Sequence, residues 1–127
     1  MHAVDGLDEI SLASPTHVAE LRNGQITEYS IQPEDFGIDS QSLIGLSVDG
    51  PQESLELIQA ALGKSREPRA QKARDLITLN AGAAIYAADI ADTLAEGIAR
   101  AQDAIGSGLA LEKIGELVSF TACFDTP

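Results

Sequence analysis

The stretch "HVAELRNGQITEYSI", residues 17–31, decides how the first part of this chain folds. Two runs with the composition of β-strands flank Asn23-Gly24, a dipeptide that fits a two-residue turn in which both residues have positive φ. We therefore predict an antiparallel hairpin with strands at 17–22 and 25–31.

The segments on either side of this hairpin are less regular. In "EISLA", residues 9–13, Ile10 and Leu12 alternate with smaller residues, which predicts a short half-buried strand. Residues 32–50 have no clear period and contain several glycines, so we expect a loop with one short turn of helix at most. Strands are thus expected within residues 1–31.

From residue 51 the pattern becomes helical. Pro51 and Pro68 each fit the first position of a helix, where a missing N–H is harmless. The first helix is predicted to end at Gly63 and the second near Asp89. The second half of this helix, "LNAGAAIYAA", is apolar on nearly every side, which predicts burial on every side. We expect Asn80 within it to be a buried structural hydrogen-bonding residue rather than part of a site.

Two further helices complete the expected pattern. Asp92 is the predicted cap of a third helix, which carries an apolar stripe and breaks at "GSG", residues 106–108. A fourth helix follows with Leu111, Ile114 and Val118 on one side. The helical part is expected to span 51–119, and residues 120–127 form a tail without a pattern.

Composition excludes several classes of protein. The chain has 127 residues, which suits one domain, and its 20 acidic against 8 basic residues give a net charge of −12. This charge opposes binding to nucleic acid or to an anionic membrane. No apolar run is long enough for a membrane span, and the single cysteine fits a reducing compartment such as the cytoplasm.

Adjacent carboxylates at Asp8 and Glu9 are the candidate metal ligands. Mg²⁺ is held in proteins by one or two carboxylates, together with water and substrate phosphate. The alternative is an ordinary solvated acidic turn. Neighbouring residues of a regular strand point to opposite faces, so Gly6 must open a turn if both carboxylates serve one ion. Asp5 is a weaker candidate, because its side chain also suits a cap of this turn.

The only basic cluster could attract a phosphate, but its helical spacing favours a solvated face paired with carboxylates. It consists of Lys64, Arg66, Arg69, Lys72 and Arg74. No residue of the chain has the surroundings of a general base or a covalent nucleophile, so we assign no catalytic residue and no substrate-binding residue.

Five stretches together resemble one enzyme family. They are "DGLDEISL" (5–12), "PTHVAEL" (15–21), "ITEYSIQPEDFGI" (26–38), "LNAGAAIYAAD" (79–89) and "LAEGIARAQDAIGSGLALEKIGELV" (94–118). In this order they resemble the C-terminal part of anthranilate phosphoribosyltransferase, a glycosyltransferase of tryptophan biosynthesis. The likeness covers nearly the whole chain. One departure is Ala3, where the family commonly has glycine after the histidine.

The resemblance implies an incomplete α/β domain, here a short strand and a β-hairpin followed by about four helices. It implies a transfer of the phosphoribosyl group from phosphoribosyl pyrophosphate to anthranilate, with Mg²⁺ held against the pyrophosphate by the family's Asp-Glu pair, which matches Asp8 and Glu9. The family's glycine-rich phosphate loop and its anthranilate contacts have no counterpart in these residues.

We therefore expect residues 1–127 to be a C-terminal segment of such an enzyme, inactive alone, that self-associates or pairs with a missing N-terminal part. Two alternatives stay open at this point. The chain could be a non-catalytic binding module derived from that enzyme, or part of a related enzyme similar to nucleoside phosphorylases.

Overall fold

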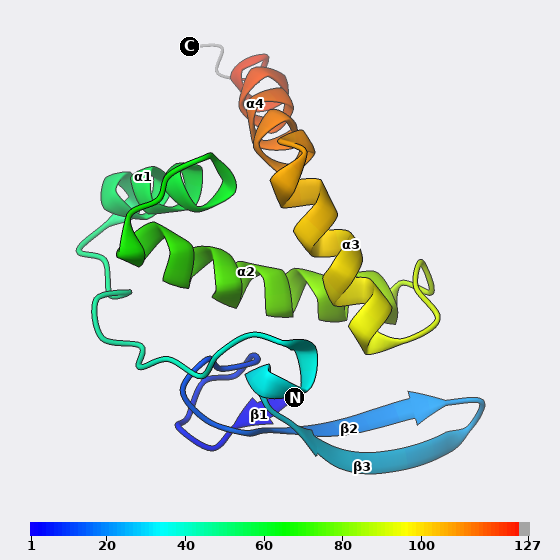
Figure 1. Cartoon of the computed structure of the whole chain (residues 1–127). Coiled ribbons are helices and arrows are strands. Elements are labelled where there is room, and N and C mark those ends of the chain that lie inside the picture. Colours follow the sequence, from blue (N-terminus) through cyan, green and yellow to red (C-terminus); the bar gives the residue numbers. More distant parts are fainter. Residues whose placement is uncertain (125–127) are drawn as a thin grey trace.

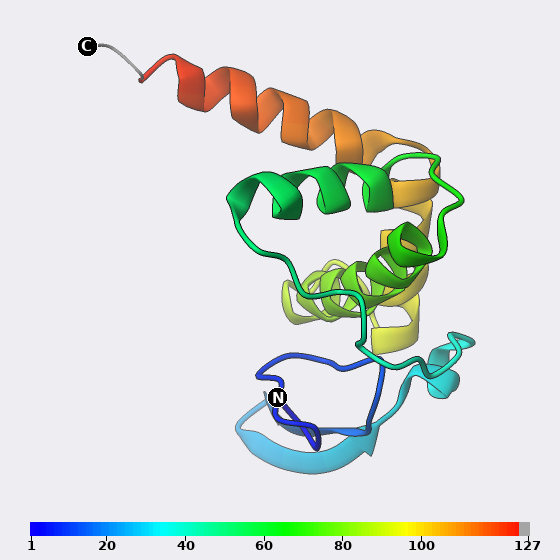
Figure 2. The ribbon, with the colours of Figure 1, turned by 90° about the vertical axis from the view of Figure 1, so that its left-hand side faces the viewer.

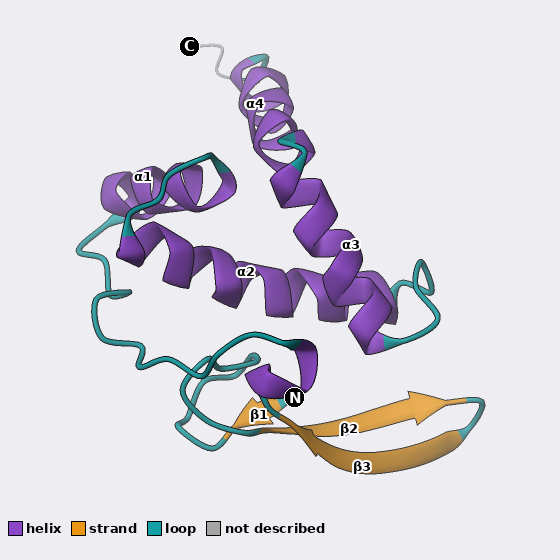
Figure 3. Ribbon diagram, viewed as in Figure 1, coloured by secondary structure: helices purple, strands orange, loops and turns teal. Residues whose placement is uncertain are grey.

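In a computed structural model, described here for residues 1–124, a small sheet lies on one side of a set of helices (Figure 1). The elements are β1 (His2–Ala3), β2 (Thr16–Arg22), β3 (Gln25–Ile31), the short 3₁₀ helix η1 (Pro33–Phe36), α1 (Pro51–Leu62), α2 (Pro68–Ala87), α3 (Leu94–Gly106) and α4 (Leu109–Ala122). The three strands form one antiparallel sheet in the order β1-β2-β3. This arrangement confirms the expected fold class of strands followed by four helices (Figure 3).

The β2–β3 hairpin forms as the sequence predicts. Asn23 and Gly24 make the turn with φ values of 52° and 77°, and Leu21 lies opposite Ile26 in the register of the two strands. Both residues of the turn are left-handed, which matches the twist of the flanking strands. The inner face of the hairpin is buried at Val18, whereas Leu21 and Ile26 on the outer face are each 72% exposed.

The strand predicted at residues 9–13 is wrong. This segment is irregular, and the sheet's first strand is instead β1, which pairs with the start of β2. Ile10, Ser11 and Leu12 are all buried, so the apparent alternation does not separate an inner from an outer face. Ser11 can be buried because its hydroxyl donates to Asp5 in the same loop and its backbone N–H donates to Thr16 at the start of β2.

The central element is α2, which lies between the sheet layer and α1 in both ribbon views (Figures 1 and 2). The core joins the strand layer to α2 and α3, and consists of Ile10, Leu12, Val18, Ile31, Ile38, Leu79, Ala83 and Ile98. The second half of α2 is not buried on every side, as its sequence predicted, because Ala84 and Ala87 are exposed. This half of the helix is covered where the loop 4–15, the hairpin and α3 reach it.

The crossing of α2 and α3 depends on two glycines. A Cβ atom added to Gly82 would lie 2.5 Å from the Cα of Ile98, and one added to Gly97 would lie 2.3 Å from the carbonyl oxygen of Gly82. Such distances are shorter than any real Cβ contact, so the two helix backbones touch here. Gly82 of α2 therefore permits the close approach of α3.

Three helix boundaries differ from the sequence prediction. The helix α4 runs to Ala122, inside the tail predicted at 120–127, of which residues 125–127 lie outside the described part of the chain. The cap of α3 is Thr93 and not Asp92, because the Thr93 side chain accepts a hydrogen bond of 3.1 Å from the backbone N–H of Glu96. The N–H of Asp92 donates to the Glu96 carboxylate instead. At the other end of the same loop, α2 stops at Ala87, shortly before Asp89 adopts a positive φ of 55°.

A polar latch docks the hairpin on α2. The hydroxyl groups of Tyr86 and Tyr29 donate to the two oxygens of the Glu20 carboxylate at 2.6 and 3.0 Å, and Arg22 donates to the Tyr86 hydroxyl at 2.9 Å. Burial, followed by donation to Glu20, raises the pKa of Tyr29 to about 12. The latch brings together two charged side chains of β2 and two tyrosine hydroxyls, one from β3 and one from α2.

The glycine contact gives a prediction with a matched control in the same fold. Gly82→Ala forces a methyl group into the α3 backbone and should lower the free energy of unfolding by about 1–3 kcal/mol or more. Gly115→Ala should instead raise it by about 0.5–1 kcal/mol, because Gly115 is helical and a Cβ there meets nothing within 4 Å. Urea denaturation followed by circular dichroism measures both, and equal effects of the two substitutions would contradict the proposed close contact.

Candidate functional site

The candidate site is the loop between β1 and β2, residues 4–15, which begins as a tight turn. The N–H of Gly6 donates to the carbonyl of Ala3 at 3.0 Å, and the N–H of Ala3 donates to the carbonyl of Leu7 at 2.9 Å. Gly6 has a φ of 97°, a conformation that favours glycine. The turn thus leads directly into Asp8 and Glu9.

Asp8 and Glu9 lie in a bend and are both exposed. Because neither belongs to a strand, the rule that neighbouring residues point to opposite faces does not apply to them. Within residues 1–124, neither carboxylate accepts a hydrogen bond or forms an ion pair. Gly6 therefore opens the turn that the sequence analysis required, and the two carboxylates stay free to bind a ligand from solvent.

Asp5 braces this loop from within. One of its carboxylate oxygens accepts from the hydroxyl of Ser11 and the other accepts from the N–H of Leu7. Donation by Ser11 is the main cause that lowers the pKa of Asp5 below its ordinary value, and it outweighs the opposing effect of burial. Both oxygens are engaged, so the geometry supports the turn-capping interpretation of Asp5.

Asn80 holds the other side of the loop from α2. Its Oδ1 accepts from the N–H of Ile10 at 2.9 Å, and its Nδ2 donates to the carbonyls of Ile10 and Leu76, each at 3.0 Å. Asn80 is a structural hydrogen-bonding residue, as predicted, but it is half-buried and not buried. Its partner, however, is the residue directly after Glu9, and no local pattern in the sequence indicates this pairing.

The donor set fits a weakly held Mg²⁺ ion. Across residues 1–124 there is no group of three or more His, Cys, Asp or Glu side chains placed to enclose a metal. Proteins commonly supply one or two carboxylate ligands to Mg²⁺, and phosphate oxygens and water complete the octahedron. The two exposed carboxylates of Asp8 and Glu9 match this number. Asp8 and Glu9 alone would hold such an ion weakly, and a phosphorylated ligand would strengthen its binding.

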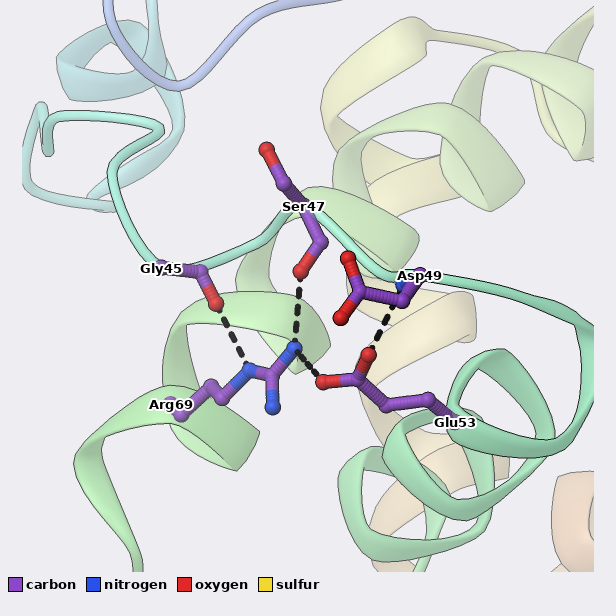
Figure 4. A network of polar contacts seen from close by, with 5 residues as sticks. All are labelled: Gly45, Ser47, Asp49, Glu53 and Arg69. Carbon is purple, nitrogen blue, oxygen red and sulfur yellow. Dashed lines mark hydrogen bonds and ion pairs between the residues drawn. The ribbon is translucent and has the colours of Figure 1, made fainter.

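The basic cluster is structural at three of its five members. Arg69 donates to the carbonyls of Gly45 and Ser47 at 2.6 and 2.9 Å and to the carboxylate of Glu53 at 2.7 Å, and Glu53 also accepts from the N–H of Asp49 (Figure 4). These contacts tie the loop 37–50 to α1 and α2.

Two other members bind backbone carbonyls in the same way. Lys72 donates to the carbonyl of Ile44, and the guanidinium of Arg74 donates to three carbonyls at and after the end of α1. The basic side chains were predicted to pair with carboxylates, but most of their hydrogen bonds go to backbone carbonyls. Side chains engaged in this way do not form an open phosphate site.

A cleft of about 610 Å³ lies between the hairpin and the end of α2. It is lined in part by Glu20, Arg22, Tyr29 and Tyr86, which the sequence analysis did not identify. Their polar groups are hydrogen-bonded to one another. The cleft is therefore lined by the side chains of the hairpin latch. Asp8 and Glu9 do not line it.

None of the helices in residues 1–124 has the length and apolar character needed to cross a membrane.

Comparison with protein families gives one match over most of the chain. The model described as "Glycosyl transferase family, a/b domain" matches residues 1–111. Among curated proteins, the chain is 64% identical over 124 residues to anthranilate phosphoribosyltransferase of Azotobacter vinelandii and 65% identical over 124 residues to that of Stutzerimonas stutzeri. Each match covers 98% of this chain and 36% of the relative.

Solved structures agree on the fold. The anthranilate phosphoribosyltransferase of Thermus thermophilus matches with a TM-score of 0.75 and 32% identity, over 91% of this chain and 33% of that one. The Saccharomyces cerevisiae enzyme in complex with PRPP and Mg matches with a TM-score of 0.69 and 23% identity, over 87% of this chain and 31% of that one. The chain thus spans about a third of the length of the proteins it matches.

The loop geometry separates a structural carboxylate from two free ones. Asp5→Asn should lower the free energy of unfolding near neutral pH. The further decrease of this free energy in acid should be smaller in the variant than in the wild type. Because the folded-state pKa of Asp5 lies below its ordinary value of 3.8, the contribution is present above that value and is lost as the pH falls through the folded-state pKa. The double substitution Asp8→Asn with Glu9→Gln should change stability by no more than about 0.5 kcal/mol.

Urea denaturation from about pH 7 down to about pH 2 measures both effects. A steeper acid loss in the wild type than in Asp5→Asn is the expected result. Identical profiles for Asp5→Asn and the double variant would show that Asp5 does not brace the loop.

Proposed function

Because this chain belongs to the glycosyl transferase family of the α/β domain type, we propose that it forms part of an enzyme that transfers the phosphoribosyl group of phosphoribosyl pyrophosphate to anthranilate. The observation that carries this proposal is the identity of 64–65% to anthranilate phosphoribosyltransferases over nearly the whole chain. The exposed carboxylate pair of the loop 4–15 agrees with a phosphorylated substrate bound through a metal ion. An enzyme of amino-acid biosynthesis would work in the cytoplasm.

In the proposed reaction, the amino nitrogen of anthranilate gives its electron pair to the anomeric carbon of the ribose. The bond from this carbon to the pyrophosphate oxygen breaks with both electrons on the oxygen, and the nitrogen loses a proton to solvent. Charge therefore builds up on the leaving group, where stabilisation accelerates the reaction most. Mg²⁺, when bound, would supply positive charge at the pyrophosphate.

The proposed task of Asp8 and Glu9 is to present two anionic oxygens at a fixed place beside the leaving group. A net charge of −12 would by itself repel pyrophosphate, so a cation between the carboxylates and the phosphates is needed. No side chain of this segment is required as a general base. The phosphate loop and the anthranilate contacts would belong to the rest of the enzyme, and the chain alone is proposed to be inactive.

Activity is tested by measuring the loss of anthranilate fluorescence after adding phosphoribosyl pyrophosphate and Mg²⁺. The purified chain should cause no loss. A chimera in which this chain replaces the matched third of the Azotobacter vinelandii relative should be active. Asp8→Asn with Glu9→Gln in that chimera should lower turnover by about tenfold or more and change its Mg²⁺ dependence.

Asp103→Asn is the matched control, because it removes an exposed carboxylate from α3, and it should leave turnover unchanged. Turnover by the isolated chain would refute its proposed inactivity. An active double variant with an unchanged Mg²⁺ response would refute the metal role.

We further propose that the rest of a longer family domain covers α4. No residue of this helix is buried, and Leu109, Leu117, Val118 and Phe120 are each 57–63% exposed. Figure 1 shows the helix projecting beyond α3, and Figure 2 shows it running above α1. A 14-residue helix is marginal without a packing partner, and the matched relatives extend well beyond the region that this chain covers.

The isolated chain should consequently self-associate or bind a hydrophobic dye, because exposed apolar patches recruit partners. Leu117→Glu should reduce both properties. Ser119→Glu adds the same charge on α4 outside the apolar residues and should have little effect. Sedimentation at micromolar concentration and dye fluorescence measure this, and a compact wild-type monomer without dye binding would contradict the proposal.

A further inference from the structure

The amide of Asn80 makes a two-point contact with the loop that carries the candidate metal ligands. It accepts from the N–H of Ile10 and donates to the carbonyl of the same residue, at 2.9 and 3.0 Å. A neighbouring strand pairs with one residue of its partner in the same way. Asn80 therefore takes the place of a strand at a point where the sheet does not continue.

Fixing both backbone groups of Ile10 also fixes the orientation of the peptide units before and after it. The peptide unit before it is the one that joins Glu9 to Ile10. The side chain of Ile10 is only 1% exposed and packs in the core, so this residue cannot rotate to follow a moving loop. On the other side of the bend, Asp5 and Gly6 fix the chain through their own turn. Asp8 and Glu9 are thus held between two anchored points while their side chains stay free.

Asparagine is suited to this contact because one planar group supplies both an acceptor and a donor. Its remaining N–H donates to the carbonyl of Leu76 at 3.0 Å, one turn earlier on α2. That bond lies within α2 and orients the Asn80 amide toward the loop 4–15. Residues that lack either the donor or the acceptor cannot hold both backbone groups of Ile10.

We propose that Asn80 is a positioning residue that orders the bend of Asp8 and Glu9 for a divalent cation. This inference rests on the proposed metal role of that pair. Two carboxylates bind an ion more tightly when they are already ordered, because less conformational entropy is lost on binding. Asn80 does not touch the ion and acts through the backbone of Ile10.

The experiment follows the amide signals of the full chain by NMR while Mn²⁺ is added as the probe cation. Paramagnetic broadening should affect Asp8 and Glu9 at lower Mn²⁺ concentration than Glu34 and Asp35. The latter pair is an internal control, because its carboxylates are occupied by the backbone N–H groups of Ser40 and Gln32.

Three variants separate positioning from general stability. Asn80→Ala removes the contact and Asn80→Leu removes it while filling the space. Each should raise the Mn²⁺ concentration needed at Asp8 and Glu9 by about tenfold, the effect typical of residues that orient metal ligands. Ile105→Val removes a buried methyl group of α3 away from the loop, and should leave the response unchanged even if it lowers thermal stability.

The outcomes are distinct. If both Asn80 variants respond to Mn²⁺ as the wild type does, the positioning role is refuted. If Ile105→Val weakens the response as much as they do, the effect is one of stability alone and the positioning role is refuted as well. If Asp8→Asn with Glu9→Gln leaves the wild-type response unchanged, the proposed metal role fails, and the inference fails with it. Hydrogen exchange of the Ile10 amide, which should become faster in both Asn80 variants and stay slow in Ile105→Val, reports the loop contact independently of any metal.

Discussion

The contact between the backbones of α2 and α3 is the constraint on which this fold depends. Gly82 and Gly97 let two helices meet at a distance that no side chain permits. With the helices this close, Leu79 and Ala83 of α2 and Ile98 of α3 share one core with the strand layer. The hairpin and the loop 4–15 then dock on the same helix through Tyr86 and Asn80. The placement of the candidate site is therefore a consequence of how α2 is packed.

Local patterns were sufficient wherever the structure is set by neighbouring residues. Asn23-Gly24 defines the hairpin because its turn needs two left-handed residues, and Pro51 and Pro68 begin their helices because they lack an N–H. The pattern failed at residues 9–13, where Ser11 was expected on an exposed face. It is buried because Asp5 and Thr16, both in or beside the loop, supply its partners, and alternation alone cannot show such partners. Thr93 and Asp92 are both good caps, and only the backbone geometry selects between them.

The same distinction applies to the candidate site. Asp8 and Glu9 could be identified from the sequence as a pair, and the resemblance to a family gave the pair a role. The parts that hold the loop could not be identified, because Asn80 and Ile10 are 70 positions apart and no rule of spacing connects them. The basic cluster was misjudged for a related reason. Arg69 and Lys72 bind carbonyls of the loop 37–50, which lie 22–28 positions away, and Arg74 binds carbonyls at and after the end of α1. Candidate metal ligands can thus be identified from a sequence, whereas the residues that orient them can be identified only from the structure.

The hairpin latch also determines which part of the molecule its tyrosine absorption reflects. The chain has two tyrosines and no tryptophan, and both tyrosine hydroxyls donate to the single carboxylate of Glu20. Its near-ultraviolet absorption beyond the phenylalanine bands therefore comes from two rings in one contact, one on β3 and one on α2. Tyrosine spectra of this protein would describe the docking of the hairpin on the helix, while the separation of α4 or the loosening of the loop 37–50 would leave them almost unchanged.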